Sequence, residues 1–195
     1  ALDAAGRGYE AMRAINPRLV WCSLTGFGST GPNAEAAGHD ITYVGYAGLM
    51  PRLSQYEPSP PGVGVSLPLA AMTGALGIVA AINARHTTGV GARVDANMVD
   101  SAMWTLSEDF ARAANSPMPG WGTMAARGVY RCADGRCMAV GALELKFWRI
   151  VCEVLGRPEW ADRHWSLGLE VGSAAAMALR DEVAAEEAGA SDDEQ

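Results

Sequence analysis

The chain has 195 residues, of which 49% are hydrophobic and 19% charged, and this composition is typical of a folded globular protein rather than a disordered one. Its net charge of −7 argues against nucleic acid as a partner, because phosphate backbones are bound by basic surfaces. An acidic chain can still hold an anionic cofactor through a local cluster of backbone N–H groups and one or two Arg side chains.

The four cysteines form no CxxC pair and lie at no zinc-finger spacing; they are Cys22, Cys132, Cys137 and Cys152. We therefore expect free thiols, no metal site and a cytoplasmic location. We expect no signal peptide and no membrane span, since the most apolar stretch, 67–84, contains Pro, Thr, Gly and Asn and is predicted to be a buried helix. The chain does not begin with Met, and we expect it to be a fragment of a longer protein.

The first half of the chain alternates between helical and extended patterns. In chain order, the predicted elements are a helix at 9–15, a buried parallel-type strand at 19–24, a glycine-rich turn at 25–32, a strand or helix start at 41–49, and a proline-rich loop at 51–64. A helix at 70–85 follows, with small residues on nearly every face. Such a helix can approach its neighbours closely, so we expect it to be buried at the centre of the fold.

The second half begins with an extended lead-in at 93–99 and a helix that continues to 112. The remaining predicted elements are a loop at 115–122, a β-hairpin over 129–141 that turns at Asp134-Gly135, an amphipathic helix at 144–155 and a last helix at 174–187. This order predicts an α/β fold: part of a Rossmann-like large domain at 1–120, then part of a smaller α+β domain at 121–195 that ends in a disordered acidic tail.

A glycine motif follows the first predicted strand. Gly26-Phe27-Gly28-Ser29-Thr30-Gly31 satisfies GxGxxG, but Pro32 and a polar loop follow where a dinucleotide-binding fold would begin a helix. A tight glycine turn that brings backbone close to a ligand is therefore favoured over an NAD fingerprint.

Two further residues have both a structural and a chemical interpretation. His39 follows Gly38 and precedes Asp40, and a lone His is most often structural; Asp40 need not be its partner, because neighbours on a strand point apart. Glu144 stands at a strand-to-helix junction. It either favours the helix dipole or orients a histidine and raises its basicity, and the composition does not choose between these roles.

Four ordered segments resemble family III CoA-transferases, the family that also contains α-methylacyl-CoA racemase. They are NPRLVWCSLTGFGSTGP at 16–32, AGHDITYVGYAGLM at 37–50, GALGIVAAINARHTTGVGARVDANMVDSA at 74–102 and YRCADGRCMAVGALELKFW at 130–148. The resemblance implies an acyl-CoA thioester as substrate, no permanently bound cofactor, and a homodimer or a paralogous partner subunit. It also implies that this chain lacks the first part of the large domain.

The resemblance further implies roles for individual residues. In the racemase branch, a histidine matching His39 pairs with a glutamate matching Glu144 as one acid/base, and we assign CoA-thioester binding to Gly26, Phe27 and Gly28. The family's other catalytic residue is an aspartate, which is the nucleophile in the transferase branch. Its position here is 66 or 67, where Ser66 and Leu67 stand, and no carboxylate occurs between Glu57 and Asp95.

Several explanations of that missing aspartate stay open: a slipped alignment, a non-catalytic homologue or a degenerate gene product. The function that we expect is CoA transfer between an acyl-CoA and a carboxylate. The alternatives are a racemase-like enzyme, a catalytically silent CoA-binding subunit and a nicotinamide-binding module that depends on the glycine turn.

Overall fold

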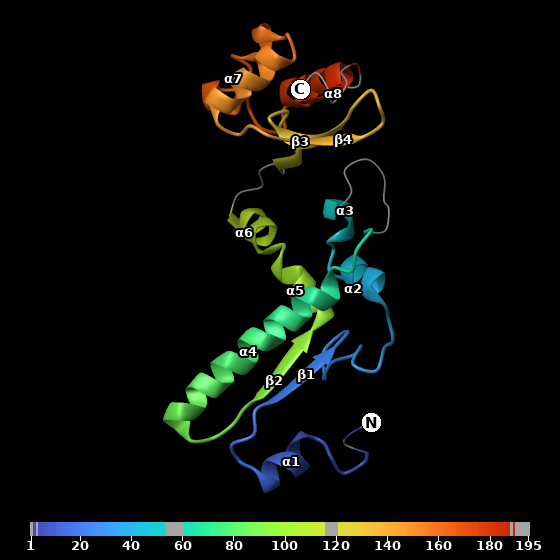
Figure 1. Cartoon of the computed structure of the whole chain (residues 1–195), viewed down its shortest axis with the longest axis vertical. Helices are drawn as coiled ribbons and strands as arrows, with labels where there is room; N and C mark the ends of the chain where they lie inside the picture. Colours follow the sequence, from blue (N-terminus) through green and yellow to red (C-terminus); the bar gives the residue numbers. More distant parts are fainter. Residues whose placement is uncertain (1, 3, 54–60, 116–120, 188, 190–195) are drawn as a thin grey trace. The chain divides into compact units, whose positions relative to one another are not determined.

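The computed structural model describes residues 2, 4–53, 61–115, 121–187 and 189. It divides into two compact units, Ala1–Glu108 and Asp109–Gln195, and each is described by itself. This division lies earlier in the chain than the domain boundary at 120/121 that the sequence predicts. The predicted acidic tail lies almost entirely outside the described residues. The fold is mixed α/β, as predicted: a parallel βαβ arrangement in the first unit, and an antiparallel hairpin with helices in the second (Figure 1).

The first unit is built around two parallel strands. Its elements are α1 (Tyr9–Ile15), β1 (Trp21–Thr25), α2 (Asp40–Tyr46), α3 (Met50–Leu53), α4 (Ser66–Thr88), β2 (Arg93–Asn97), α5 (Met98–Trp104) and α6 (Ser107–Asn115), which crosses the division. β1 pairs with β2 in register from Trp21 opposite Arg93 to Thr25 opposite Asn97. The segment 41–49, for which the sequence left strand and helix open, begins as a helix. The first residues of the predicted loop at 51–64 belong to α3, and residues 54–60 of that loop lie outside the described residues.

Helix α4 lies along both strands because glycines let its backbone approach them. A Cβ atom added at Gly77 would lie 2.6 Å from Val94 Cγ1, and one at Gly74 would lie 3.3 Å from Cys22 Sγ. A side chain at Gly77 would therefore push the helix away from β2. A long helix that connects two parallel strands and packs on them is the crossover of a βαβ unit, from which Rossmann-like folds are built.

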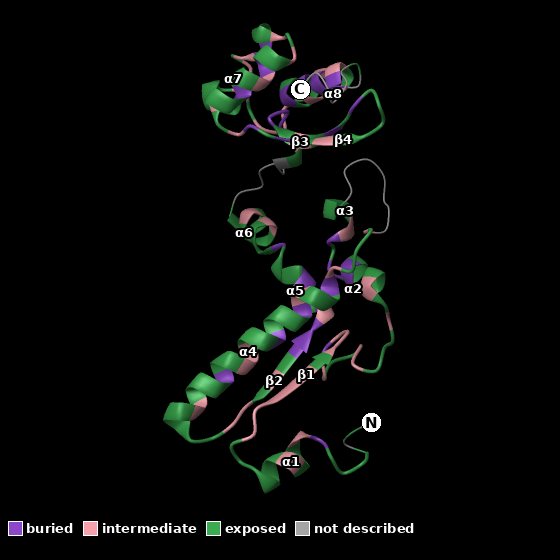
Figure 2. Cartoon of the chain, in the orientation of Figure 1, coloured by how far each residue is buried: buried purple, intermediate pink, exposed green. Residues whose placement is uncertain are grey.

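The prediction that the helix at 70–85 is buried at the centre of the fold is wrong for the described residues, in which α4 is buried on one face. Its buried residues are Ser66, Ala70, Gly74 and Ala81. The opposite face of α4 is exposed (Figure 2), and it carries large apolar side chains: Met72 and Leu76 are each 71% exposed, and Val79 is 63% exposed. Small residues on nearly every face permit close packing on every side, but among the described residues of the first unit α4 packs on β1, β2, α5 and the start of α2, and its other face is open.

The sequence predicts no membrane span, and by length and composition alone one described helix, α4, could cross a membrane. α4 has 23 residues, and the mean hydropathy of its most apolar window is 1.7. Its packing on β1 and β2 is that of a crossover helix, and core helices can meet the same two criteria.

The second unit is a hairpin covered by helices. Its elements are η1 (Trp121–Thr123), β3 (Arg127–Arg131), β4 (Cys137–Gly141), α7 (Leu145–Val154), η2 (Pro158–Trp160), η3 (Trp165–Leu167) and α8 (Ala174–Glu187). The predicted hairpin is confirmed: β3 and β4 pair antiparallel, and Gly135 takes the left-handed conformation (φ 85°) that its turn requires. Trp148 and Trp160 lie in the core, where the Trp148 indole N–H donates to the Trp160 carbonyl at 3.0 Å.

All four cysteines are free, as predicted. Cys132 and Cys152 are buried, Cys22 is half-buried and Cys137 is exposed. Burial raises the pKa of the Cys152 thiol to about 11, so this side chain stays protonated at neutral pH. Among the residues that the structure describes, no group of three or more His, Cys, Asp or Glu side chains is placed to hold a metal ion.

Candidate functional site

The carboxyl ends of β1 and β2 form one edge of the parallel pair. β1 ends at Thr25 and leads into the glycine turn, and β2 ends at Asn97 and leads into α5. Ligands of open α/β folds bind outside this edge, because loops and helix starts converge there. The glycine turn at 26–31, the segment Gly38 to Asp40 and the start of α4 constitute the candidate site, which we call the glycine-turn site.

Hydrogen bonds hold the glycine turn against the strands. The Gly28 N–H donates to Thr25 Oγ1 at 3.0 Å, and Gly28 has a φ of 99° that favours glycine. The Ser29 N–H donates to Asp95 Oδ2 at 3.0 Å, and the Ser29 hydroxyl donates to the same oxygen. Arg93 in turn donates to Ser29 Oγ at 2.9 Å. The turn is therefore ordered by β2, which brings Gly26, Phe27 and Gly28 to the carboxyl edge of the strands.

Tyr43 on α2 joins the glycine turn to the histidine segment. Its hydroxyl donates to the Gly38 carbonyl at 2.7 Å, and the Phe27 ring meets the Tyr43 ring edge-on with centroids 5.2 Å apart. Cβ atoms added at Gly26 and Gly38 would lie 2.5 Å and 2.9 Å from the Tyr43 ring. Both glycines are therefore required by one aromatic side chain. Sequence reasoning missed this residue, because a single Tyr within a short apolar segment carries no specific signal.

His39 lies at the start of α2. Its backbone is extended, with φ −123° and ψ 173°, and its carbonyl accepts from the N–H groups of Thr42 at 2.8 Å and Tyr43 at 3.2 Å. Its residue as a whole is exposed. The backbone of His39 is thus fixed by α2, where the His39 N–H also donates to Thr42 Oγ1 at 3.4 Å in a capping box, and the residue lies at the surface of the unit.

Asp40, the next residue, binds the start of α4. Its carboxylate accepts from Ser66 N at 2.7 Å, from Ser66 Oγ at 2.7 Å, from Val65 N at 3.0 Å and from Leu67 N at 3.4 Å. Partial burial alone would raise the pKa of Asp40, but the hydrogen bonds from Ser66, Val65 and Leu67 outweigh it, so that the pKa lies below its ordinary value of 3.8. Asp40 is therefore an anion with a defined partner, although its partner is α4 and not His39.

The two candidate positions of the family aspartate differ in their surroundings. Ser66 is completely buried and donates its hydroxyl to Asp40, whereas Leu67 is 51% exposed. Position 66 therefore faces the fold, and position 67 faces outward. The carboxylate beside these two residues is Asp40.

Glu144 lies in the second unit, where it precedes α7. Its carbonyl accepts from Phe147 N at 2.9 Å and Trp148 N at 3.0 Å, it makes no side-chain cap bond to the helix, and it is exposed. The structural interpretation of a helix-start acid and the chemical interpretation are both compatible with this position. His39 belongs to the first unit and Glu144 to the second, so their pairing stays a prediction.

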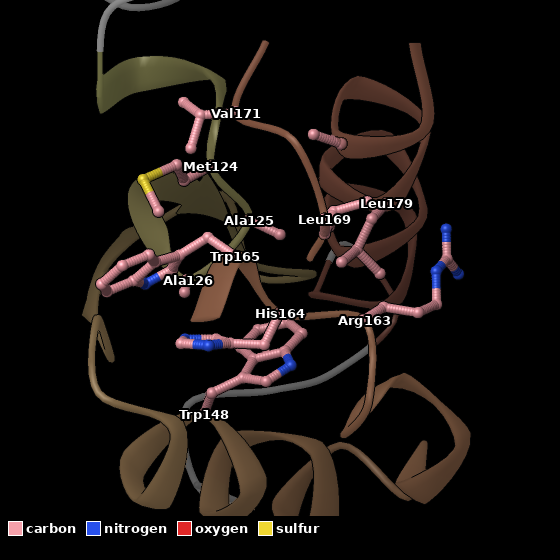
Figure 3. A pocket seen from close by; sticks show the side chains of 11 residues that line it. Met124, Ala125, Ala126, Trp148, Arg163, His164, Trp165, Leu169, Val171 and Leu179 are labelled. Atoms are coloured by element: carbon pink, nitrogen blue, oxygen red, sulfur yellow. The ribbon is translucent and has the colours of Figure 1, made fainter. Parts of the chain in front are cut away.

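A separate cavity of about 20 Å³ lies inside the second unit, below Met124 and Val171 (Figure 3). His164 is buried there beside the Trp148 ring, and its Nδ1 accepts from the Ser166 N–H at 3.2 Å. Burial lowers the pKa of His164, against the opposing effect of the Leu143 backbone. The cavity is large enough for about one water molecule, so it is not a substrate site.

Comparison with known proteins gives one consistent family. The model of CoA-transferase family III matches residues 1–193. The chain is 35% identical over 163 residues to α-methylacyl-CoA racemase of Homo sapiens, covering 76% of this chain and 42% of that protein. It is 31% identical over 169 residues to succinyl-CoA:glutarate CoA-transferase of Mus musculus, covering 83% of this chain and 38% of that protein.

Solved structures agree with these relatives. A CAIB/BAIF family protein from Brucella suis superposes with a TM-score of 0.71 at 27% identity, over 98% of this chain and 53% of that chain. The chain therefore spans about half or less of the length of the proteins that it matches.

Proposed function

This chain belongs to CoA-transferase family III, and we propose that the protein containing it acts on acyl-CoA thioesters by moving CoA between an acyl-CoA and a carboxylate. The observation that carries the proposal is the match of the family model over 1–193, on a chain whose glycine turn and His39 lie at the carboxyl edge of a βαβ unit. Gly26, Phe27 and Gly28 are proposed to contact the CoA thioester, because the turn presents both backbone and an aromatic ring there.

Transfer along the family route requires a carboxylate nucleophile. That carboxylate attacks the thioester carbonyl, the C–S bond breaks, and the acyl group stays on the enzyme as an anhydride while CoA leaves as the thiolate. Ser66 and Leu67 supply no such group, and Ser66 is buried against Asp40. We therefore propose that this chain by itself binds acyl-CoA without transferring CoA at a rate typical of the family.

A racemase-like reaction is the second candidate, and the exposed position of His39 favours it. Racemisation needs two acid/base groups on opposite faces of the α-carbon, one that removes the proton and one that returns it. His39, with Glu144 as its proposed partner, would serve one face. The other face would lack its carboxylate for the reason given above, which leaves slow α-proton exchange from the His39 face.

A homodimer or a paralogous partner subunit is proposed as the assembly. The support is the exposed apolar face of α4, with Met72, Leu76 and Val79, because large apolar patches on a protein surface mark contacts with other chains. A cytoplasmic location is proposed as well, since free thiols persist in reducing compartments.

A binding titration tests the proposed ligand. Acetyl-CoA is titrated into the chain and into Phe27→Ala, with Phe110→Ala as the matched control, because Phe110 is an exposed Phe of α6 that belongs neither to the glycine turn nor to the segment of Glu144. We expect saturable binding that Phe27→Ala weakens about tenfold and Phe110→Ala leaves unchanged. NADH is titrated in parallel. Micromolar quenching of the tryptophans by NADH, without binding of acetyl-CoA, would support the nicotinamide-binding alternative instead.

A further inference from the structure

The start of α4 and the start of α2 are joined by one side chain. The first N–H groups of a helix have no partner within the helix and must find one elsewhere. At α4, the N–H groups of Val65, Ser66 and Leu67 all donate to the carboxylate of Asp40, and Pro68 has no N–H. Asp40 therefore satisfies every N–H donor at this helix start, from a position 25 to 27 residues earlier in the chain.

Asp40 is adjacent to His39, whose other neighbour is held too. Gly38 accepts the Tyr43 hydroxyl at 2.7 Å, so the segment is bound by α2 on one side of His39 and by α4 on the other. We propose that Asp40 is a positioning residue: by binding the first turn of α4, it fixes the backbone from which His39 presents its imidazole at the glycine-turn site. The functional part of this inference rests on the proposed function, whereas the positioning itself does not.

The geometry argues for a structural rather than a direct chemical role of this carboxylate. Its two oxygens are engaged by three N–H groups and the Ser66 hydroxyl, and a carboxylate so solvated by donors is a weak nucleophile and a weak base. It also lies at the positive end of a 23-residue helix, which stabilises the anion further. Asp40 therefore acts indirectly, by fixing the backbone of His39.

Ser66 takes part in the same hydrogen-bonded contact between Asp40 and the start of α4. Its hydroxyl donates to the carboxylate from a completely buried position, so it adds one hydrogen bond to the three from the backbone. Removing that hydroxyl should loosen the start of α4 less than neutralising Asp40 does. The two variants therefore form a graded series.

The experiment uses the whole chain and two readouts that do not depend on activity. Amide hydrogen exchange is measured at Val65, Ser66 and Leu67, and the ring resonances of the three histidines are followed by NMR. The variant is Asp40→Asn. The matched control is Asp134→Asn, which makes the same change to a hydrogen-bonded carboxylate in the second unit.

Asp40→Asn should speed exchange at the three amides about tenfold or more, because each loses a charge-assisted acceptor. It should also shift or broaden the His39 ring resonances and leave those of His86 and His164 in place. Asp134→Asn should do neither. Unchanged exchange at 65–67, or His39 resonances that coincide with those of the unmodified chain, would overturn the proposal.

If Asp40→Asn does not fold, Ser66→Ala is the test variant. It keeps the carboxylate and the backbone donors, so amide hydrogen exchange at 66 and 67 should become a few-fold faster. The His39 ring resonances should shift by less than we expect for Asp40→Asn. Identical spectra and exchange rates in Ser66→Ala would count against the proposal. A chain that shows these effects but does not bind acetyl-CoA would keep the positioning role and contradict the proposed function instead.

Discussion

The contact between Ser66 and Asp40 determines which residue of this site could accept a new carboxylate. The Ser66 hydroxyl lies 2.7 Å from Asp40 Oδ1 and is fully buried. The family resemblance implies that the aspartate's position is 66 or 67 without choosing between them. The structure separates the two positions, because a buried acid at 66 would lie against an existing anion while one at 67 would not.

Ser66→Asp is therefore predicted to destabilise the chain, whereas Leu67→Asp is tolerated. Two carboxylates in contact and away from water repel each other, and we expect Ser66→Asp to lower the free energy of unfolding by about 2–4 kcal/mol at pH 7. Leu67→Asp should change it by less than about 1 kcal/mol, because the side chain is half-exposed. Urea unfolding of both variants measures this difference, and equal midpoints would contradict it.

The lowered pKa of Asp40 predicts a dependence of stability on pH. A carboxyl group whose pKa is lower in the folded state than in the unfolded state stabilises the fold above its unfolded pKa, near 3.8. That contribution is lost as the pH falls through the lowered folded pKa. The melting temperature of the unmodified chain should therefore drop more steeply below about pH 4 than that of Asp40→Asn. Parallel curves for the two proteins would show that Asp40 does not contribute.

Local patterns in the sequence predicted most of the elements correctly, and the failures have physical causes. The hairpin was predictable because alternation and an Asp-Gly turn are local signals, and β1 because a short apolar run has no helical period. The start of α2 was ambiguous because its hydrogen bonds to α4 are made across 26 residues. For the same reason the role of Asp40 could not be predicted, because nothing in the local sequence indicates that its carboxylate binds the N–H groups of Val65 and Ser66.

The exposed face of α4 gives a prediction opposite to the one drawn from composition. Small residues on nearly every face predict a buried helix, but Ala80 is exposed. We therefore expect Ala80→Leu to leave the urea midpoint of this chain unchanged. Ala70 is completely buried, so Ala70→Leu should cost about 1–3 kcal/mol. A loss of stability in Ala80→Leu comparable to that in Ala70→Leu would show that the outer face is covered.

Across the whole molecule, the pairing of His39 with Glu144 stays a prediction. The two residues belong to separate compact units, and 105 positions separate them in the chain. No local pattern encodes a contact at that separation; only the resemblance to the racemase branch implies it. The glycine turn, by contrast, was predictable because glycines after a strand are a local signal.

The pairing predicts an effect of one residue on the other. If the carboxylate of Glu144 reaches the imidazole, Glu144→Gln should shift the His39 ring resonances and leave those of His86 in place. Glu153→Gln is the matched control, since Glu153 lies on α7, the helix that Glu144 precedes. Coinciding His39 resonances in Glu144→Gln and the unmodified chain would contradict the pairing in this chain.

The most direct test of the central claim is turnover of acyl-CoA by the chain. The chain is incubated with a 2-methylacyl-CoA in deuterated water, and separately with an acyl-CoA and a free carboxylate, and the products are followed by mass spectrometry. We expect bound acyl-CoA, at most slow uptake of deuterium at the α-carbon through His39, and no CoA transfer at a rate typical of the family. Steady racemisation or steady CoA transfer would contradict this claim, because a catalytic carboxylate would then have to exist at a position other than 66 or 67.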